Sequence, residues 1–216
     1  MNKKEEIQIK LYKKLKDSDW ADLLKSFILS EEFEKIIEFL ITQSSDDDKF
    51  TPPLKDIFNA FETCNLKDLK IVLIGGYPFL NPAYCDGIAY SHPSSCKRWH
   101  NINRCFRKTL GIKNFNLSFL AKQGILMINN PLTTSTKRES LMHLKAWKPF
   151  IVFLIDMLKT KYPDMTWILL EQGVQLSPLL KGQNVIKCLS VSEPSKEYES
   201  SISKILTEKG IVWEGQ

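Results

Sequence analysis

The chain alternates short apolar runs with longer amphipathic segments. Four of the runs are rich in apolar residues and too short for helices, so each predicts a buried strand. These runs are Ile71–Ile74, Ile125–Ile128, Trp167–Leu170 and Val185–Leu189. Segments with apolar residues at helical spacing separate them, and strands that alternate with helices predict a parallel sheet covered on both faces. The pattern predicts a three-layer α/β/α fold with a central four-stranded parallel sheet, as a single domain over residues 1–216.

The N-terminal quarter of the chain has a helical pattern. Between Trp20 and Thr42 apolar residues recur at the spacing of two amphipathic helices, and Leu54–Phe61 predicts another short helix after Pro52-Pro53. Residues 1–18 are dense in Lys and Glu and predict an N-terminal helical extension, solvated and partly frayed. A basic arm that contacts a partner is the alternative interpretation of this extension.

Composition limits the class of protein without identifying it. With 216 residues, of which 43% are hydrophobic, the chain can build one sizeable core. The net charge of +5 permits nucleic-acid binding but does not demonstrate it. No run approaches the roughly 18 apolar residues of a membrane span, and the first residues lack the apolar core of a signal peptide. We expect a soluble intracellular protein with no membrane partner, in a compartment that the sequence does not distinguish.

The five cysteines are scattered and odd in number, which argues against a disulfide framework. A zinc site could be drawn from His92, Cys96, His100 and Cys105. Their spacing fits no established zinc motif, so ordinary side chains are the favoured interpretation. We expect neither a metal nor another cofactor.

The strand that ends near Ile74 runs directly into Gly75-Gly76-Tyr77-Pro78. Two residues without a Cβ allow a sharp turn and a close approach to the backbone. A buried strand followed by a glycine turn is typical of the rim of an α/β ligand site. This signal alone is weak, because every parallel sheet needs such turns.

The following residues make the signal specific. Gly75 to His92 reads GGYPFLNPAYCDGIAYSH, and it resembles without a gap the uracil-DNA glycosylase stretch GQDPYHGPGQAHGLAFSV. Leu117 to Thr133, LSFLAKQGILMINNPLT, resembles the same family's L..WA.QGVLLLN..LT. The resemblance extends from about Trp20 to Trp213 and implies the uracil-DNA glycosylase fold. The cysteines lack the paired spacing of the iron–sulfur branch of that superfamily.

The resemblance implies a base pocket. Asn129 matches the Asn that reads uracil, and its amide can both donate and accept. Tyr90 matches the aromatic residue on which the extruded base stacks, and Phe79 matches the Tyr that bars 5-methylated pyrimidines. A strand-end cap for Asn129 and plain core packing for the two aromatic residues are the alternatives. The expected pocket consists of Gly75, Gly76, Tyr77, Pro78, Phe79, Tyr90 and Asn129.

The positions that the resemblance assigns to catalysis carry different residues. Tyr77 stands where the family has its water-orienting Asp, and Glu193 stands where it has the His that stabilises the departing base. Neither replacement supplies the same chemistry, because Tyr77 has no carboxylate and an ionised Glu193 repels an anion. Asp86 is a candidate for a relocated water activator, although an Asp before Gly87 is more typical of a turn. Glu193, if protonated by burial, could act as an acid.

The resemblance also implies where DNA is contacted. Lys97 and Arg98 lie in a loop that pinches phosphates in the family, and Ser195 retains a hydroxyl that contacts a phosphate. Glu197 takes the place of the Leu that wedges into the base stack, and a carboxylate is a poor wedge. We therefore expect weak DNA binding that is dominated by phosphate contacts. His143, in a matching Ser-His segment, is expected to be structural.

Three functions follow as hypotheses. The favoured one is a uracil-DNA glycosylase-like protein that has lost uracil excision and acts as a DNA- or protein-binding factor in DNA repair or replication, as relatives in large DNA viruses do. The second is an active DNA glycosylase with altered chemistry or with specificity for a modified pyrimidine. The third is a protein-binding decoy, and a replication or repair protein is the partner expected for a binding role.

Overall fold

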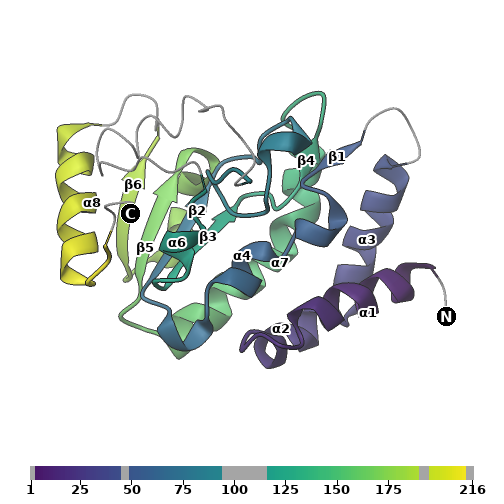
Figure 1. The fold of residues 1–216 in the computed structure, drawn as a ribbon, viewed down its shortest axis with the longest axis horizontal. Coiled ribbons are helices and arrows are strands. Elements are labelled where there is room, and N and C mark those ends of the chain that lie inside the picture. The colour runs from purple at the N-terminus through teal and green to yellow at the C-terminus, as the bar shows by residue number, and fades with distance from the viewer. Residues whose placement is uncertain (1–2, 45–48, 94–115, 190–194, 213–216) are drawn as a thin grey trace.

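The computed structural model describes residues 3–44, 49–93, 116–189 and 195–212 of the chain. Its centre is a four-stranded parallel sheet of β2 (Ile71–Gly75), β3 (Ile125–Asn129), β5 (Thr166–Leu170) and β6 (Asn184–Cys188). The strand order is β3-β2-β5-β6, so β2 lies between β3 and β5 (Figure 1). All four strands coincide with the predicted runs to within one or two residues at each end, and the predicted sheet is confirmed.

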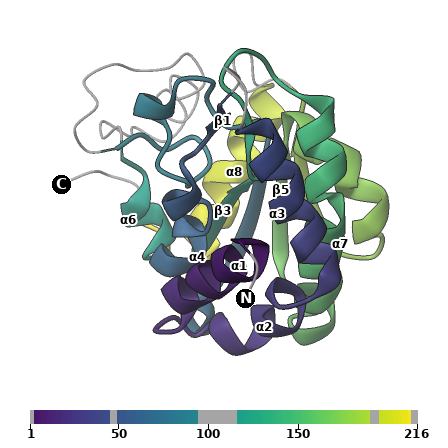
Figure 2. The same cartoon turned by 90° about the vertical axis from the view of Figure 1, so that its right-hand side faces the viewer.

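Helices cover both faces of this sheet. Leu73, in register with Met127 and Ile168, lies on the face that packs against α6 (Ser118–Ala121) and α8 (Lys196–Glu208). Leu120, Ile202 and Leu206 are the residues that these helices contribute. Figure 2 shows α7 (Leu141–Lys161) on the side of the sheet opposite α6. The molecule therefore has the predicted α/β/α layers.

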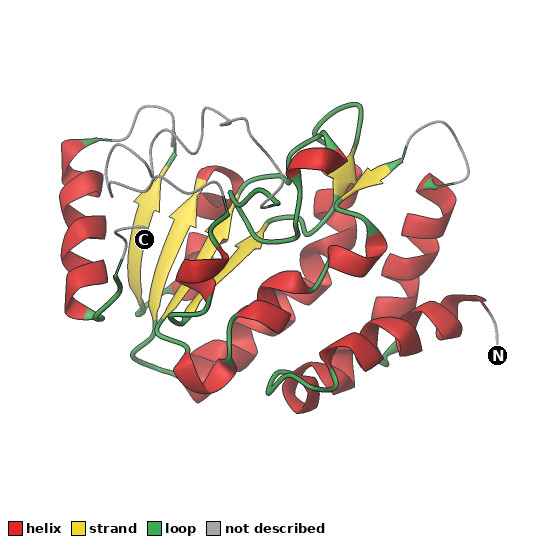
Figure 3. Cartoon of the chain, viewed as in Figure 1, coloured by secondary structure: helices red, strands yellow, loops and turns green. Residues whose placement is uncertain are grey.

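Of the helices that precede the sheet in sequence, three pack against α7, and the first packs on those three. In chain order these helices are α1 (Lys3–Leu15), α2 (Ala21–Ile28), α3 (Glu31–Gln43) and α4 (Asn59–Thr63), grouped beside α7 in Figure 3. Buried aromatic rings join them, and Phe150 of α7 contacts Phe27, Phe58 and Phe61 at centroid distances of 5.5, 5.8 and 6.0 Å. Within the described ranges, no helix is both long and apolar enough to cross a bilayer.

The N-terminal helix corrects one expectation. Leu11 and Leu15 of α1 are buried in the core, and Gln8 donates to the carbonyls of Ile28 and Ser30, each at 3.1 Å. The segment was expected to be solvated and frayed, because its Lys and Glu residues outnumber its apolar ones. Leu11 and Leu15, with the partly buried Ile7 and Tyr12, suffice to pack one face on the core while the charged side chains stay in water.

Two further details differ from the prediction. The helix expected over Leu54–Phe61 is a 3-10 turn (Leu54–Asp56) followed by the short α4, which begins at Asn59. A second, antiparallel sheet pairs β1 (Phe50–Thr51) with β4 (Thr134–Ser135). Strands of two residues are too short to leave a periodic pattern in a sequence.

Candidate functional site

The candidate site lies where β2, β3 and β5 end. Gly75 closes β2 in register with Asn129, the last residue of β3. The backbone N–H of Asn130 donates to the carbonyl of Gly76 at 3.1 Å and ties the two strand ends together. Glu171 follows the last residue of β5 and begins the 3-10 helix η4 (Glu171–Leu180). The sheet thus brings three of its carboxyl ends to one place, where open α/β sheets bind ligands.

Tyr90 reaches this place from the loop after β2. The N–H of its neighbour Ala89 donates to the carbonyl of Met127 at 3.0 Å, which fixes the loop against β3. The Tyr90 ring is 4% exposed and lies directly over Gly75, where an added Cβ would be 2.6 Å from its Cε2 atom. Gly75 therefore leaves room for the ring. Tyr90 and Asn129 both adjoin Gly75.

The Tyr90 hydroxyl joins two elements of the site. Its oxygen accepts a hydrogen bond from the backbone N–H of Gly76 at 3.2 Å and donates one to Oε2 of Glu171 at 3.0 Å. Both Tyr90 and Glu171 adopt left-handed backbone conformations, with φ of 62° and 51°. Such conformations are costly for residues other than Gly and cluster at functional sites.

Glu171 is a site residue that the sequence analysis missed. Burial raises the pKa of its carboxyl above the ordinary value, the Tyr90 hydrogen bond lowers this pKa, and the negative charge of Glu139 raises it. The carboxyl lies over Gly76, since a Cβ on that residue would be 2.6 Å from Oε2 of Glu171. A signal was available in the sequence: Glu171 directly follows a predicted strand, as Asn129 does.

Asn129 is 7% exposed. Its backbone belongs to the sheet, and its side-chain amide has no hydrogen-bond partner among the described residues. Its amide atoms are not among the fully buried, unpaired polar atoms of the described residues, so they keep contact with the space at the strand ends. The amide is therefore available to a ligand.

The turn after β2 places the remaining pocket residues. Tyr77 is partly exposed, and burial together with the charge of Glu139 raises the pKa of its phenol. Pro78 is buried, and the Phe79 ring stacks on His92 with centroids 4.6 Å apart. Phe79 thus packs against the loop that carries Tyr90.

Asp86, the candidate for a relocated water activator, is bound within its own loop. Its Oδ1 accepts from the backbone N–H of Ile88 at 3.0 Å. Its Oδ2 accepts from the Ser91 hydroxyl at 2.6 Å and from the Asn116 amide at 3.4 Å. Burial raises the pKa of this carboxyl, against the lowering effect of the Ser91 and Ile88 hydrogen bonds. This geometry is that of a residue that holds a turn.

The remaining predicted site residues lie partly inside and partly outside the described ranges of the chain. Lys97, Arg98 and Glu193 lie outside the described residues. Ser195 caps α8, where its Oγ accepts from the Tyr198 N–H at 3.1 Å, and Glu197 is exposed in the first turn of that helix. A phosphate contact by Ser195 stays a prediction.

Two further expectations concern a metal site and His143. Among the described residues no group of His, Cys, Asp or Glu has a metal-binding arrangement, while Cys96, His100 and Cys105 of the weighed zinc set lie outside them. His92 Nδ1 lies 2.9 Å from the carbonyl of Tyr84. His143 is buried with its Nδ1 2.8 Å from Thr133 Oγ1, in agreement with a structural role.

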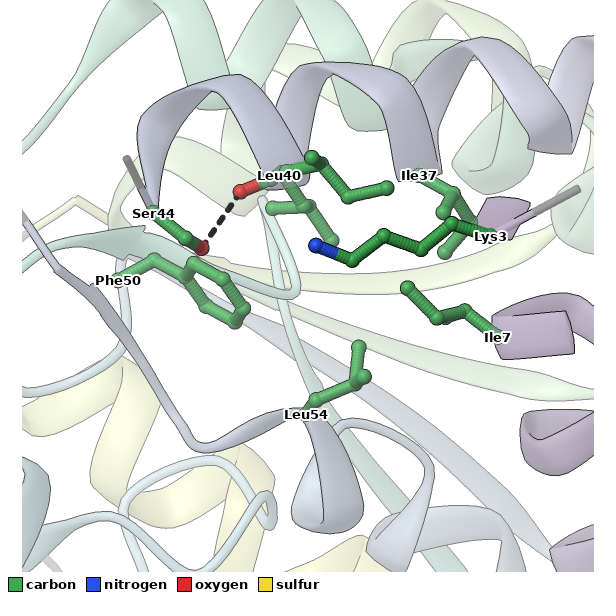
Figure 4. Close-up of a pocket in the computed structure, with 8 residues that line it drawn as sticks. Lys3, Ile7, Ile37, Leu40, Ser44, Phe50 and Leu54 are labelled. Carbon is green, nitrogen blue, oxygen red and sulfur yellow. Dashed lines mark hydrogen bonds between the residues drawn. The ribbon is translucent and has the colours of Figure 1, made fainter. Parts of the chain in front are cut away.

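A separate cavity of about 270 Å³ lies between α1, α3 and the 3-10 turn before α4. Figure 4 shows its mainly apolar lining, in which Ile7, Ile37 and Leu54 face one another. The polar atoms near it include the Ser44 hydroxyl, which donates to the carbonyl of Leu40 at 2.7 Å. It does not adjoin the strand ends and lacks the convergent polar groups found there.

Comparison with known proteins identifies relatives over most of the chain. It is 30% identical over 186 residues to the uracil-DNA glycosylase of Acinetobacter baylyi, an alignment covering 82% of this chain and 75% of that protein. The uracil-DNA glycosylase of Campylobacter jejuni strain 81-176 is 26% identical over 197 residues, covering 88% and 85% of the two chains. No protein-family model matches the chain.

Solved structures share the fold. The mimivirus uracil-DNA glycosylase aligns with a TM-score of 0.72 at 20% identity and covers 90% of this chain and 85% of that one. A variant of the mimivirus protein, solved in complex with UGI, aligns with a TM-score of 0.77 at 21% identity and covers 96% and 92% of the two chains.

Proposed function

Since the chain belongs to the uracil-DNA glycosylase family, we propose that it binds DNA and holds one extruded pyrimidine base at the ends of β2, β3 and β5. A base reached in this way must leave the stack and be recognised by hydrogen bonds to its edge and by contact with an aromatic ring. Asn129 supplies a donor and an acceptor for the edge, Tyr90 supplies the ring, and Gly75 leaves room for that ring.

The buried amide of Asn129 carries this proposal. Within the described part of the chain its side chain makes no hydrogen bond, although it is 7% exposed. An amide that served the fold alone would be expected to bond within the protein, whereas this one keeps its donor and acceptor for a ligand at the strand ends. A pyrimidine edge offers an adjacent acceptor and donor, the pair that a carboxamide matches.

We further propose that uracil excision by the family's route is lost. Excision must activate water and stabilise the departing base anion. Tyr77, at the position of the family's Asp, has no carboxylate, and the Asp86 carboxylate is occupied by Ile88, Ser91 and Asn116. A missing general acid or base costs on the order of 10²–10⁴ in rate. The function proposed here is therefore binding of the extruded base without its excision.

One observation favours the second function, an active DNA glycosylase with altered chemistry. Glu171 places a carboxyl group beside Gly76, next to the proposed base. Such a group could activate water or protonate a leaving base, in place of the residues that the resemblance assigns. A role in binding a repair or replication protein, or as a decoy, would keep the fold without any use for the base site.

Binding to short labelled oligonucleotides tests the proposal. Single- and double-stranded DNA that contains one uracil should bind more tightly than the same DNA with thymine, measured by fluorescence anisotropy. Asn129→Ala should weaken binding to the uracil DNA about tenfold, as expected for one lost recognition group. Asn65→Ala, at an exposed position in a loop, is the matched control. Equal affinity of wild type and Asn129→Ala for uracil DNA would contradict the proposal.

A further inference from the structure

The Tyr90 hydroxyl oxygen occupies a point where two groups of the site converge. It lies 3.2 Å from the N–H of Gly76 and 3.0 Å from Oε2 of Glu171. The two groups come from β2 and from the end of β5, which are neighbours in the sheet. An oxygen atom placed here can use both groups at once.

The conformation of the residues around this point is specialised. Tyr90 and Glu171 are the two non-glycine residues with positive φ in the described part of the chain, and they are bonded to each other. Each such conformation is costly and persists where the surroundings enforce it. Gly76 has no side chain that would displace the Glu171 carboxyl, which a Cβ would approach to 2.6 Å.

The chemistry of the point depends on the protonation of Glu171. A hydroxyl such as that of Tyr90 can accept from the N–H and donate to a carboxylate, so it suits ionised Glu171. A carbonyl oxygen can accept only, so it suits the N–H together with a protonated Glu171, and an ionised carboxylate repels it. Burial raises the pKa of Glu171, which favours the protonated form.

The titratable groups that face Glu171 are few. Tyr90 donates to it, and the exposed Glu139 lies near enough for its charge to raise the pKa of Glu171. The charge of Glu139 also raises the pKa of Tyr77, and the charge of Tyr198 in α8 raises the pKa of Tyr90. Burial raises the pKa of Tyr90 well above its ordinary value, so its phenol stays neutral near neutral pH.

We propose that Glu171 is a specificity-determining residue: protonated, it donates a hydrogen bond to the base carbonyl that also accepts from the Gly76 N–H. In the ligand-free protein the Tyr90 hydroxyl holds the place of that carbonyl, and the base enters by displacing it. This role deepens the proposed function and rests on it, because it needs a base at the strand ends. It assigns the oxygen-recognising position to a residue that lies outside the two motifs Gly75–His92 and Leu117–Thr133.

Two substitutions follow from this arrangement. Tyr90→Phe keeps the ring and removes the hydroxyl that competes with the ligand, so affinity for uracil should rise by about three- to tenfold, the range of one net hydrogen bond. Glu171→Gln keeps the shape and a donor that does not titrate. Wild type should bind uracil more tightly at pH 5 than at pH 8, because the protonated form of Glu171 is lost as the pH rises, and Glu171→Gln should show no such change.

The test is calorimetric titration of the full chain with free uracil between pH 5 and pH 8. The variants are Tyr90→Phe, Glu171→Gln, Asn129→Ala and, as a hydroxyl-deletion control on α1, Tyr12→Phe. The inference is supported when Tyr90→Phe gains affinity, Tyr12→Phe matches wild type and Glu171→Gln loses the pH dependence. A pH dependence that survives in Glu171→Gln belongs to another group and overturns the inference.

The outcomes separate this inference from the proposed function. Uracil binding that is weakened by Asn129→Ala, is unchanged by Tyr90→Phe and keeps its pH dependence in Glu171→Gln would refute the role of Glu171 and leave the base site in place. Two results would overturn both the inference and the proposed function. One is uracil affinity that Asn129→Ala also leaves unchanged. The other is no binding of millimolar uracil by wild type and by Tyr90→Phe.

Discussion

Asp86 uses both oxygens of its carboxylate inside the loop that carries it. Three groups donate to it, from Ile88, Ser91 and Asn116, and the last of these fixes the segment that leads into α6. Tyr90 lies in the same loop, so Asp86 acts on the site by shaping the path that brings this ring over Gly75. A sequence shows that an Asp precedes a Gly, but it does not show how many donors converge on the carboxylate.

Removing the Asp86 carboxyl should destabilise the fold. We expect Asp86→Ala to lower the free energy of unfolding by about 1–3 kcal/mol, because it leaves buried donors unpaired. Burial raises the pKa of Asp86, so its contribution to stability is full below the unfolded pKa and declines as the pH rises through the folded one. The decrease in the free energy of unfolding caused by Asp86→Ala should therefore be larger near pH 4 than near pH 8, as measured by urea unfolding.

The matched comparisons are Asp86→Asn, a neutral isostere expected to stay closer to wild type, and Asp164→Ala at an exposed position. A destabilisation by Asp86→Ala that grows with pH would contradict this account of the carboxyl.

Glu171 marks the limit of the sequence analysis at this scale. Gly75, Tyr90 and Asn129 could be placed because each belongs to a stretch that resembles a known family. The sequence places Glu171 directly after a predicted strand, but it reaches the site because β5 lies beside β2, and no local pattern encodes that strand order.

One hydroxyl joins the connection between β3 and α7 to the side chains of that helix. Thr133 Oγ1 accepts from Trp147 Nε1 at 2.6 Å and lies 2.8 Å from His143 Nδ1, and all three residues are buried. Thr133 lies shortly after Asn129 in the chain. The contacts that hold α7 therefore also fix the segment that leaves the site. The sequence identified His143 as structural but gave no sign of its partner.

Thr133→Val should remove this hydroxyl without changing the volume of the side chain. We expect a loss of about 1–3 kcal/mol in the free energy of unfolding, since the Trp147 N–H loses its acceptor in a buried setting. Urea unfolding followed by circular dichroism measures it. Thr160→Val, an exposed site in α7, should change stability by less, and equal effects would show that Thr133 does not hold the connection.

Helix α1 contributes to the core through a few apolar side chains. We expect Leu11→Ala to cost about 2–5 kcal/mol, because Leu11 is 3% exposed and its removal leaves a cavity. Lys13→Ala, on the exposed face of the same helix, should be nearly neutral. Similar unfolding midpoints for the two variants would contradict this role of α1 in the core and favour the frayed extension that its composition suggests.

At the scale of the whole molecule, the order of elements was predictable and the arrangement in space was partly so. Alternating strand and helix patterns predicted four parallel strands, because parallel strands need long crossover connections. The strand order β3-β2-β5-β6 and the small β1–β4 sheet could not be predicted, since they depend on packing between distant segments. The net charge of +5 agrees with a DNA-binding surface, and the proposed phosphate contacts Lys97 and Arg98 lie outside the described residues.

The central claim is that the protein holds a base at the strand ends without excising it. A single-turnover assay, with the protein in excess over a uracil-containing oligonucleotide, tests this claim most directly when binding is measured in the same samples. We predict that the oligonucleotide is bound and that base release stays at the level of the protein-free control. Robust release by the wild-type protein would contradict the claim, and its loss in Glu171→Gln but not in Asp86→Asn would assign the chemistry to Glu171.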